Sequence, residues 1–323
     1  MRALLVDRYA PAGIRTGEAP DPVPAPGQAL VRVQAASLSY GEIAAAAGRV
    51  PDGIDGPPDG LVLGSDAAGT IERAAADGSG PPAGTPVVTM GLTGAVAELR
   101  AVPTAAIGTV PIGVDPGAAS TLPVAGLTAL RALRRIGPLD GRRILVTGAT
   151  GGVGRFAVQL ARLAGAQVVA TTSNPASHGD ALRALGADEI FRRPAEVSQP
   201  VDGVVDQVGG AQLVEAFRVL RPHGTLVAVG HSSDDGEHFA YGDLFGNGGR
   251  HDRSIVTFFL GSTSDFAPDL TWLAVQVATG ALDAAPAWRV GLLQAPDAAL
   301  ALLGRQLHGK AVIDMTPPGG PKP

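Results

Sequence analysis

Four glycines between residues 148 and 154 have a spacing that could hold a phosphate group. Gly148, Gly151 and Gly154 stand three residues apart, and Gly152 lies between the last two. Without Cβ atoms, the backbone at Gly151 and Gly152 can approach a pyrophosphate closely, and the first N–H groups of a following helix point at it. Because the chain has 45 glycines, this spacing needs support from the elements around it.

The segments on either side of these glycines predict a strand–helix–strand unit. The apolar run 144–146 lacks polar alternation, as a buried parallel strand does. A second apolar strand over 168–171 closes a unit of about 30 residues. Between them, apolar residues share one helix face: Val153, Ala157, Leu160, Ala161 and Ala164. A glycine turn in this place predicts a dinucleotide site, with these backbone contacts: Thr150, Gly151, Gly152, Val153 and Gly154.

The residues after the second strand discriminate between NAD and NADP. An NAD site usually has Asp or Glu about 20 residues beyond the glycines, where it binds the ribose 2′-hydroxyl. Here Thr172, Ser173 and Asn174 occupy that region, and none is acidic. Hydroxyl and amide groups can hydrogen-bond a 2′-phosphate without repelling it. NADP(H) is therefore the predicted cofactor, with His178 as a nearby cationic candidate.

The chain resembles the medium-chain dehydrogenase/reductase superfamily, and within it the zinc-independent NADPH:quinone oxidoreductase branch, in the stretch VTGATGGVGRFAVQLARLAGAQVV. Other landmarks recur in order over nearly the whole chain: LPVAGLTAL at 122–130, DQVGG at 206–210, LRPHGTLVAVG at 220–230 and HGKAVID at 308–314. The resemblance implies an α/β protein with a GroES-like, partly closed β-barrel and a Rossmann domain with a doubly wound parallel sheet.

The order of elements along the chain predicts the same two domains. Short apolar runs separated by Gly and Pro over residues 1–116 indicate an antiparallel, partly closed barrel. Strands and helices alternate after the glycine turn, as in a doubly wound sheet. We predict a GroES-like catalytic domain of residues 1–116 and 262–323, and a Rossmann NADP(H)-binding domain of 117–261. Further helices are expected at 178–186, 211–220, 270–279 and 297–307, a strand at 311–314, and a disordered tail at 317–323.

By resemblance, the turn at residues 37–42 faces the nicotinamide and carries the catalytic candidates Ser39 and Tyr40. Ser39 takes the place of a family asparagine, and in zinc-dependent relatives that of the first catalytic cysteine. Ser65 takes the place of the zinc histidine. Because the chain has no cysteine and neither serine suits zinc, no metal is predicted. Tyr40 would line the pocket or donate a proton, or else tether the turn, and Glu42 is interpreted as a structural hydrogen-bond acceptor.

The resemblance also assigns cofactor contacts outside the glycine turn. They are Thr128, Gly230, His231, Phe258, Phe259 and Leu260. A solvent-exposed turn is the alternative for His231. The strand-like run 254–260 would form the edge of the Rossmann sheet and pair with a second subunit, since a bare apolar edge invites aggregation. A homodimer is the expected assembly.

Composition excludes several classes of partner. A net charge of −5 without a basic cluster argues against a nucleic-acid surface. No apolar run approaches the roughly 20 residues that cross a bilayer, so no membrane contact is expected. The first residues, MRALLVDRYAPAG, read as a strand and lack the apolar core of a signal peptide. The expected location is cytoplasmic.

The predicted function is NADPH-dependent hydride transfer, without metal, to a quinone or related small, hydrophobic, electron-poor acceptor. Ala44 stands where quinone reductases commonly place a tyrosine, and Ser39 replaces their asparagine. A reductase of an activated C=C bond, such as an enone or enoyl thioester in secondary metabolism, is therefore an alternative. A protein that binds NADPH without turnover is another.

Overall fold

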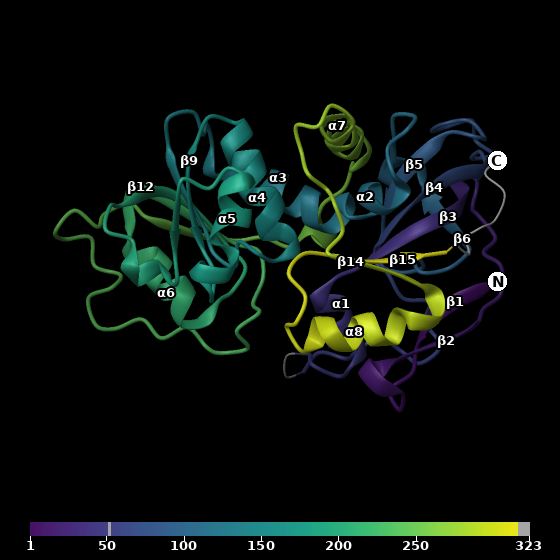
Figure 1. Ribbon diagram of the computed structural model, residues 1–323, viewed down its shortest axis with the longest axis horizontal. Helices are drawn as coiled ribbons and strands as arrows, with labels where there is room; N and C mark the ends of the chain where they lie inside the picture. Colours follow the sequence, from purple (N-terminus) through teal and green to yellow (C-terminus); the bar gives the residue numbers. More distant parts are fainter. Residues whose placement is uncertain (51–52, 316–323) are drawn as a thin grey trace. The chain divides into compact units, whose positions relative to one another are not determined.

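The computed structural model describes residues 1–50 and 53–315, which form two compact units (Figure 1). The first unit comprises Met1–Leu127 and Gly261–Pro323, and the second comprises Thr128–Leu260. The tail predicted to be disordered, 317–323, lies outside the described residues.

The chain enters the second unit later than the predicted boundary between residues 116 and 117. Helix α2 (Pro116–Ser120) and the π-helical turn after it belong to the first unit. Ser37 Oγ donates to the carbonyl oxygen of Ser120 at 2.9 Å, and Val124 N donates to Asp66 Oδ1 at 2.8 Å. These long-range bonds keep residues 116–127 with the first unit. The second crossing, at Leu260/Gly261, lies one residue before the predicted one.

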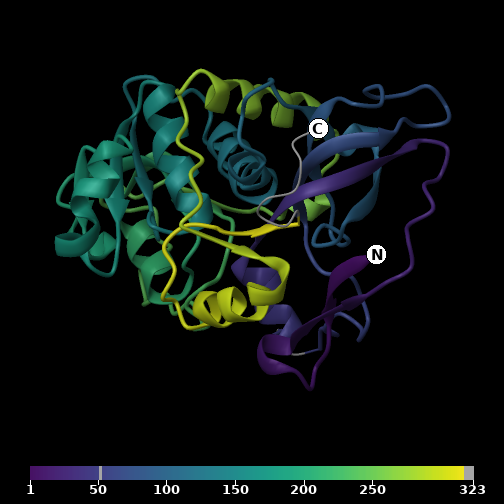
Figure 2. The same ribbon diagram turned by 45° about the vertical axis from the view of Figure 1, so that its right-hand side comes forward.

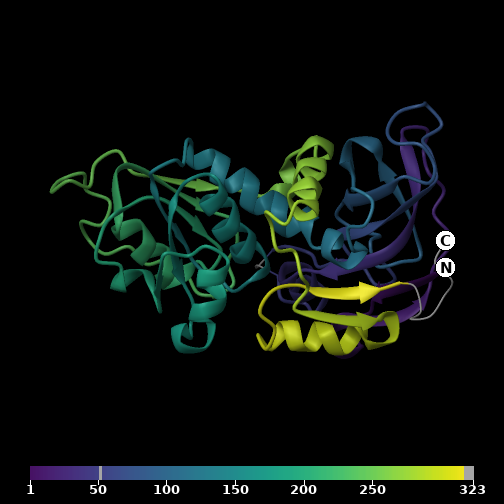
Figure 3. The ribbon, with the colours of Figure 1, turned by 45° about the horizontal axis from the view of Figure 1, so that its top comes forward.

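The first unit is built on a mainly antiparallel, seven-stranded sheet in the order β14-β15-β3-β4-β5-β7, with β6 also paired to β3. Strands β14 and β15 form its one parallel pair among the described residues (Figure 3). A separate pair, β1 and β2, completes the unit. Its strands are β1 (Arg2–Val6), β2 (Ile14–Glu18), β3 (Gln28–Leu38), β4 (Asp66–Arg73), β5 (Pro86–Met90), β6 (Leu99–Pro103), β7 (Ile107–Thr109), β14 (Trp288–Gly291) and β15 (Ala311–Asp314).

Small residues allow close packing of the helices in the first unit. Helix α8 (Ala295–Leu303) packs beside α1 (Tyr40–Ala46), as Figure 2 shows, and its residues Ala295, Ala298 and Ala299 are fully buried in the core. A Cβ atom at Gly126 would lie 3.1 Å from Leu273 of α7 (Ala267–Ala278). Gly126 therefore allows a close contact of its turn with α7.

The second unit has a six-stranded sheet in the order β10-β9-β8-β11-β12-β13, and every pair in it is parallel. The order reverses between β8 and β11, so a crevice for a ligand is expected at the carboxyl ends of these two strands. Its strands are β8 (Arg143–Val146), β9 (Gln167–Thr171), β10 (Glu189–Phe191), β11 (Val201–Asp206), β12 (Leu220–Ala228) and β13 (Ser254–Thr257). Its helices are α3 (Leu127–Ile136), α4 (Gly152–Leu163), α5 (Pro175–Ala184) and α6 (Gly210–Arg218).

Helices cover both faces of this sheet, which explains its apolar strands. Leu145 and Val204 pack with residues of α6 in one cluster. On the other face, Ile136 of α3 lies against Gly203, where a Cβ atom would approach its side chain to 2.5 Å. The predicted α/β fold class, with a GroES-like unit and a Rossmann-like parallel sheet, is confirmed.

Three helices begin before their predicted positions, at Pro175, Ala267 and Ala295. Each has a proline at its first or second position, where the ring's fixed φ suits a helix and the missing N–H costs nothing. The prediction started these helices at their apolar periodicity and overlooked this signal.

Strand β13 is shorter than the predicted run 254–260. It ends at Thr257, and the chain then turns towards a 3₁₀ turn at Leu260–Ser262. Phe258 is buried, with the Arg135 guanidinium 3.9 Å from the centre of its ring. β13 forms an edge of the sheet. Pairing of this edge with a second subunit stays a prediction.

Within residues 1–50 and 53–315, no helix combines the length and apolar character needed to cross a membrane.

Candidate functional site

The glycine turn connects β8 directly to α4 at the reversal point of the sheet. Gly148 has φ +57, a left-handed conformation that favours glycine. Gly151 caps α4 with extended backbone, and the helix begins at Gly152. The first N–H groups of a helix have no intrahelical acceptor, so those of α4 are available to an anion. The structure thus gathers the predicted contacts, residues 150–154, at one strand end.

Gly154 is held against the turn so closely that no side chain fits there. A Cβ atom at this position would lie 2.5 Å from the Gly148 oxygen and 2.7 Å from Ala149 Cα. Both are backbone atoms, which cannot move aside as a flexible side chain can. Gly154, which lies in α4, therefore lets this helix pack directly on the backbone of the turn.

A buried polar cluster holds the carboxyl ends of β8 and β11 together. Thr147 Oγ1 donates to Asp206 Oδ1 at 2.6 Å, and Gly209 N donates to Asp206 Oδ2 at 2.9 Å. Gln207 Nε2 donates to the Thr147 carbonyl at 2.7 Å. Burial raises the pKa of Asp206 above its ordinary value. The sequence analysis quoted DQVGG only as a landmark and missed this role.

The predicted NADP-discriminating residues lie at the carboxyl end of β9, beside the glycine turn. Ala149 N donates to the Thr171 carbonyl at 2.9 Å, which ties the two segments. Thr172 Oγ1 hydrogen-bonds His178 Nδ1 at 3.1 Å, and Asn174 caps α5 by accepting from Ser177 N. Ser173 is exposed. These residues are neighbours, and two of them already have structural partners.

Gly230 and His231 follow β12 and lie next to Gln207 at the same edge of the sheet. A Cβ atom on Gly230 would lie 3.2 Å from the Gln207 carbonyl oxygen. His231 Nε2 hydrogen-bonds Glu237 Oε1 at 2.7 Å, and Gly210 N donates to the same oxygen at 2.8 Å. The hydrogen bond from Gly210 N lowers the pKa of Glu237, and the hydrogen bond with His231 lowers it further. The His231 side chain is 47% exposed, and it is already hydrogen-bonded to Glu237.

The remaining assigned contacts lie at the ends of the second unit. Thr128 and Leu260 are its first and last residues, and both are buried. Phe258 N donates to the Ala228 carbonyl at 2.9 Å, which extends the pairing of β13 with β12 by one residue. Phe259 is 67% exposed. Their contact with a cofactor stays a prediction.

In the first unit, Ser39 lies in a buried polar array with Lys310 and Asp66. Lys310 Nζ donates to Ser39 Oγ at 2.6 Å and to Asp66 Oδ2 at 2.7 Å. Both charged side chains are nearly or fully buried. Strand register explains the meeting, because Ala311 of β15 pairs with Leu38 of β3, which brings Lys310 opposite Ser39. On the other side of β3, Ser37 pairs with Asp66 and donates to it at 2.9 Å.

Tyr40, the second catalytic candidate, turns its hydroxyl inward. Its ring packs against the core of the first unit. The hydroxyl oxygen is buried and has no hydrogen-bond partner among the described residues. This orientation does not suit a proton donor to a ligand, and the packed ring agrees with the alternative, an aromatic side chain that tethers the turn.

Glu42 holds the Ser39 turn, as predicted for a structural acceptor. Its carboxylate accepts from Ser39 N at 2.6 Å and from the N and Oγ of Ser65 at 3.1 Å each. Burial raises the pKa of Glu42 to about 7, a shift that Lys310 opposes. Arg100 donates to the Ser65 carbonyl at 3.1 Å, and burial lowers the pKa of its guanidinium to about 10.

We expect Glu42 to make the protein less stable as the pH rises from 4.5 to about 7. In this window the unfolded chain has released the Glu42 proton and the folded chain retains it, so the free energy of unfolding falls. The loss should not exceed about 3 kcal/mol. Urea unfolding at about pH 5 and about pH 8 would measure it, with Glu42→Gln as the variant that lacks this loss. An equal pH dependence in both proteins would contradict the assignment.

The sequence analysis missed Lys310, Asp66 and Arg100 as members of the site. Two signals could have pointed to them. Lys310 is one of only two lysines in the chain, and it directly precedes a strand. Asp66 directly follows Ser65, which the analysis had already aligned with a metal-binding position.

Two family models match the chain, one within the first unit and one mainly in the second. The model for "Alcohol dehydrogenase GroES-like domain" matches residues 25–113, and that for "Zinc-binding dehydrogenase" matches residues 152–275.

Two relatives are similar over most of the chain. Prostaglandin reductase-3 of Bos taurus is 32% identical over 249 residues, which are 72% of this chain and 64% of the relative. The spectinabilin polyketide synthase system protein NorB of Streptomyces orinoci is 36% identical over 245 residues, or 69% of this chain and 11% of that protein. The chain thus spans less than two thirds of the length of either relative.

Solved structures share the fold over nearly the full length. The quinone oxidoreductase from Coxiella burnetii has a TM-score of 0.82 at 23% identity, and the match covers 98% of this chain and 99% of that one. A mycobacterial protein complexed with NADPH has a TM-score of 0.81 at 24% identity, with 97% and 99% covered.

Proposed function

The chain belongs to the medium-chain dehydrogenase/reductase superfamily. We propose that it is an NADPH-dependent, metal-independent reductase. Its acceptor would be an electron-poor compound in which a double bond is conjugated to a carbonyl group. As a member of that superfamily it is an oxidoreductase that binds a nicotinamide cofactor. A quinone is the first acceptor class that we propose.

The glycine turn fits the pyrophosphate of a dinucleotide. The open N-terminus of α4 supplies N–H donors, and Gly151 and Gly152 leave the backbone accessible. Ser173 and its neighbours offer hydroxyl and amide groups near the ribose, with no carboxylate among residues 171–174. When bound, NADPH would supply a hydride to the acceptor.

The groups near Ser39 do not fit a catalytic zinc. Ser39 Oγ accepts a hydrogen bond from the Lys310 ammonium, which would repel a second cation. Ser65 Oγ donates to Glu42 at 3.1 Å. Zinc in proteins prefers cysteine, histidine and carboxylate ligands, and serine hydroxyls in these bonds are poor substitutes. We derive no step through a metal.

The observation that carries the proposal is the 2.6 Å bond from Lys310 Nζ to Ser39 Oγ. An ammonium group can only donate, so the Ser39 oxygen must accept, and its own proton is directed to another acceptor. The positive charge also makes this proton easier to release. Ser39 is therefore the group we assign as proton donor, and Lys310 the residue that orients and polarises it.

The proton transfer balances with reduction of a conjugated carbonyl. After the hydride transfer that a bound cofactor would supply, Ser39 would give one proton to the oxyanion that develops on the acceptor's oxygen. Ser39 recovers a proton from Lys310, and solvent restores the ammonium. The Asp66 carboxylate, 2.7 Å from Nζ, accepts a second hydrogen bond from Lys310 and holds its side chain beside Ser39.

Reduction of an activated C=C bond is the second candidate. It is favoured by the names of the two relatives, a prostaglandin reductase and a polyketide synthase system protein, at 32% and 36% identity. An enone or enoyl thioester would take the hydride at its β-carbon, and the enolate oxygen would need the same donor as a quinone oxygen.

A spectroscopic assay tests the proposed function. Purified protein with NADPH and a panel of quinones, enones and enoyl thioesters should oxidise the nicotinamide with at least one acceptor class, also after exhaustive chelation. Binding of NADPH without oxidation by any acceptor would favour a non-catalytic binding protein. Loss of turnover on chelation, restored by zinc while the unfolding midpoint stays unchanged, would contradict the metal-independent mechanism.

We expect Ser173→Asp to shift the cofactor preference from NADPH towards NADH. The side chain is exposed, so the substitution should not disturb packing, and a carboxylate there would repel a 2′-phosphate. Fluorescence titration with each nucleotide would show a loss of NADPH affinity of at least about tenfold, or 1.4 kcal/mol. Ser198→Asp, which adds the same charge at an exposed position before β11, is the control. A preference for NADH in the unchanged protein would refute the cofactor assignment.

A further inference from the structure

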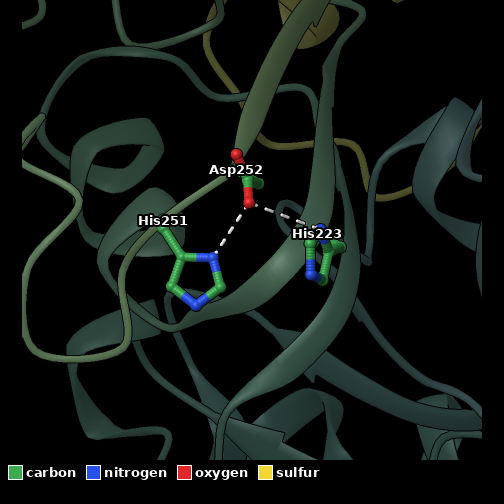
Figure 4. A group of neighbouring side chains, drawn as sticks. All are labelled: His223, His251 and Asp252. Atoms are coloured by element: carbon green, nitrogen blue, oxygen red, sulfur yellow. Dashed lines mark hydrogen bonds and ion pairs between the residues drawn. The ribbon is translucent and has the colours of Figure 1, made fainter.

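Two histidines and an aspartate meet at the start of the edge strand β13 (Figure 4). Strands β12 and β13 are parallel, and Thr225 pairs with Ser254. Two residues before this pair, His223 of β12 therefore lies across from Asp252, which precedes β13, and His251 is the neighbour of Asp252 in sequence. The cluster thus results from strand register together with the end of a long connecting segment, 229–253.

The ligand atoms of the three side chains face a common space. Asp252 Oδ2 lies 3.0 Å from His251 Nδ1 and 3.8 Å from His223 Nδ1, so one oxygen faces both rings. All three ligand atoms lie within 4.8 Å of one another. The two rings are nearly perpendicular, with centres 5.5 Å apart, so they contact each other edge to face beside Asp252.

The backbone favours this convergence at a cost. His223 and Asp252 have φ values of +63 and +55, in the left-handed region that residues other than glycine rarely adopt. Such a conformation is strained in residues other than glycine and often marks a site with a function. Here it occurs at two facing residues of one cluster.

We propose that His223, His251 and Asp252 bind a divalent transition-metal ion, with zinc as the preferred ion. Imidazole nitrogen and carboxylate oxygen are typical zinc ligands, at bond lengths of about 2.0 Å that separate neighbouring ligand atoms by about 3.3 Å. Two of the observed separations are close to this value. The side chains are 74%, 51% and 66% exposed, so they can close on the ion without unpacking the core, and water can complete the tetrahedron.

Charge supports a cation at this place. The carboxylate of Asp252 is the acidic member of the cluster and faces both imidazole rings. The guanidinium of Arg253 is turned away, since it donates to the carbonyls of Phe217 and Asp243. The ion would link the start of β13 to β12 and so hold the end of segment 229–253 in place. It is a structural role, separate from the polar array at Ser39.

Zinc titration of the untagged, chelator-treated full chain tests the site by calorimetry. We expect one ion per chain, and His223→Ala should weaken its binding at least tenfold. His238→Ala, which removes another exposed histidine from segment 229–253, should leave the titration unchanged. Ser39→Ala should also leave it unchanged, which separates this site from the first unit. Saturating zinc should raise the unfolding midpoint of the unchanged protein and not that of His223→Ala.

Two results would overturn the proposal. One is the absence of binding tighter than about 1 mM, the level of a weak surface contact. The other is a zinc affinity that His223→Ala and Asp252→Asn both leave intact, which would place the ion elsewhere on the chain.

Discussion

Replacing Lys310 by methionine and Asp66 by asparagine together should lower kcat for an enone about 100- to 1000-fold, the usual effect of losing a donor to a developing oxyanion. Without the ammonium, Ser39 loses the charge that polarises its hydroxyl and the bond that fixes its direction. The double variant is needed because Lys310→Met alone would leave Asp66 charged, buried and without its ion pair. Breaking a buried ion pair in this way typically costs roughly 3–5 kcal/mol of stability.

The measurements can separate a role in proton transfer from a role in folding. Affinity for NADPH should change by less than about twofold, since the nucleotide contacts we assign lie in the other unit. The loss should be larger with an enone, whose enolate is strongly basic, than with a quinone, whose reduced anion is weakly basic. A purely structural defect would lower both rates by the same factor, and that result would contradict the mechanism.

Two further variants serve as comparison. Ser39→Ala should be about as slow as the double variant, and combining the changes should add little, because both act on one proton transfer. Tyr40→Phe should retain kcat. It should also be as stable as the unchanged protein or more so, since it removes a buried hydroxyl that has no partner in the described part of the chain.

The second unit was predictable because its signals are local. The strand at 144–146, the glycines and the apolar face of α4 lie within one short stretch, and each constrains the conformation of its neighbours. The parallel sheet and the superfamily were therefore identified before any coordinates, and both predictions are confirmed. Helix boundaries were less accurate where a proline or a capping residue such as Asn174 extends a helix beyond its apolar stripe.

The polar array around Ser39 was not predictable in the same way. Lys310 is 271 positions from Ser39 in sequence, and their contact depends on the register of β15 against β3. Asp66 enters through the register of β4. A one-residue shift of either strand would turn these side chains to the opposite face, and no local pattern encodes that register. The late crossing into the second unit, at Leu127/Thr128, has the same cause, because long-range bonds from Ser37 and Asp66 hold residues 116–127.

Gly154→Ala should abolish measurable NADPH binding, a loss of at least about 100-fold, or 2.7 kcal/mol. The added methyl group would meet the Gly148 oxygen at 2.5 Å and Ala149 Cα at 2.7 Å, so the turn must move away from α4. That movement carries the N–H groups of α4 and the backbone of Gly151 out of alignment with the pyrophosphate. Overpacking of this kind also costs about 1–3 kcal/mol of stability.

Binding and folding can be separated with two matched glycines. Gly41→Ala places its methyl group in open space and adds a better helix former to α1, so stability and NADPH affinity should be retained. At Gly151 a Cβ atom would come no closer than 3.3 Å to the described chain, so Gly151→Ala should fold normally and still bind NADPH weakly. Calorimetric titration and thermal unfolding of all three variants would test this. If Gly154→Ala binds NADPH as tightly as Gly41→Ala, the turn does not hold the pyrophosphate, because that displacement cannot leave its N–H donors in place.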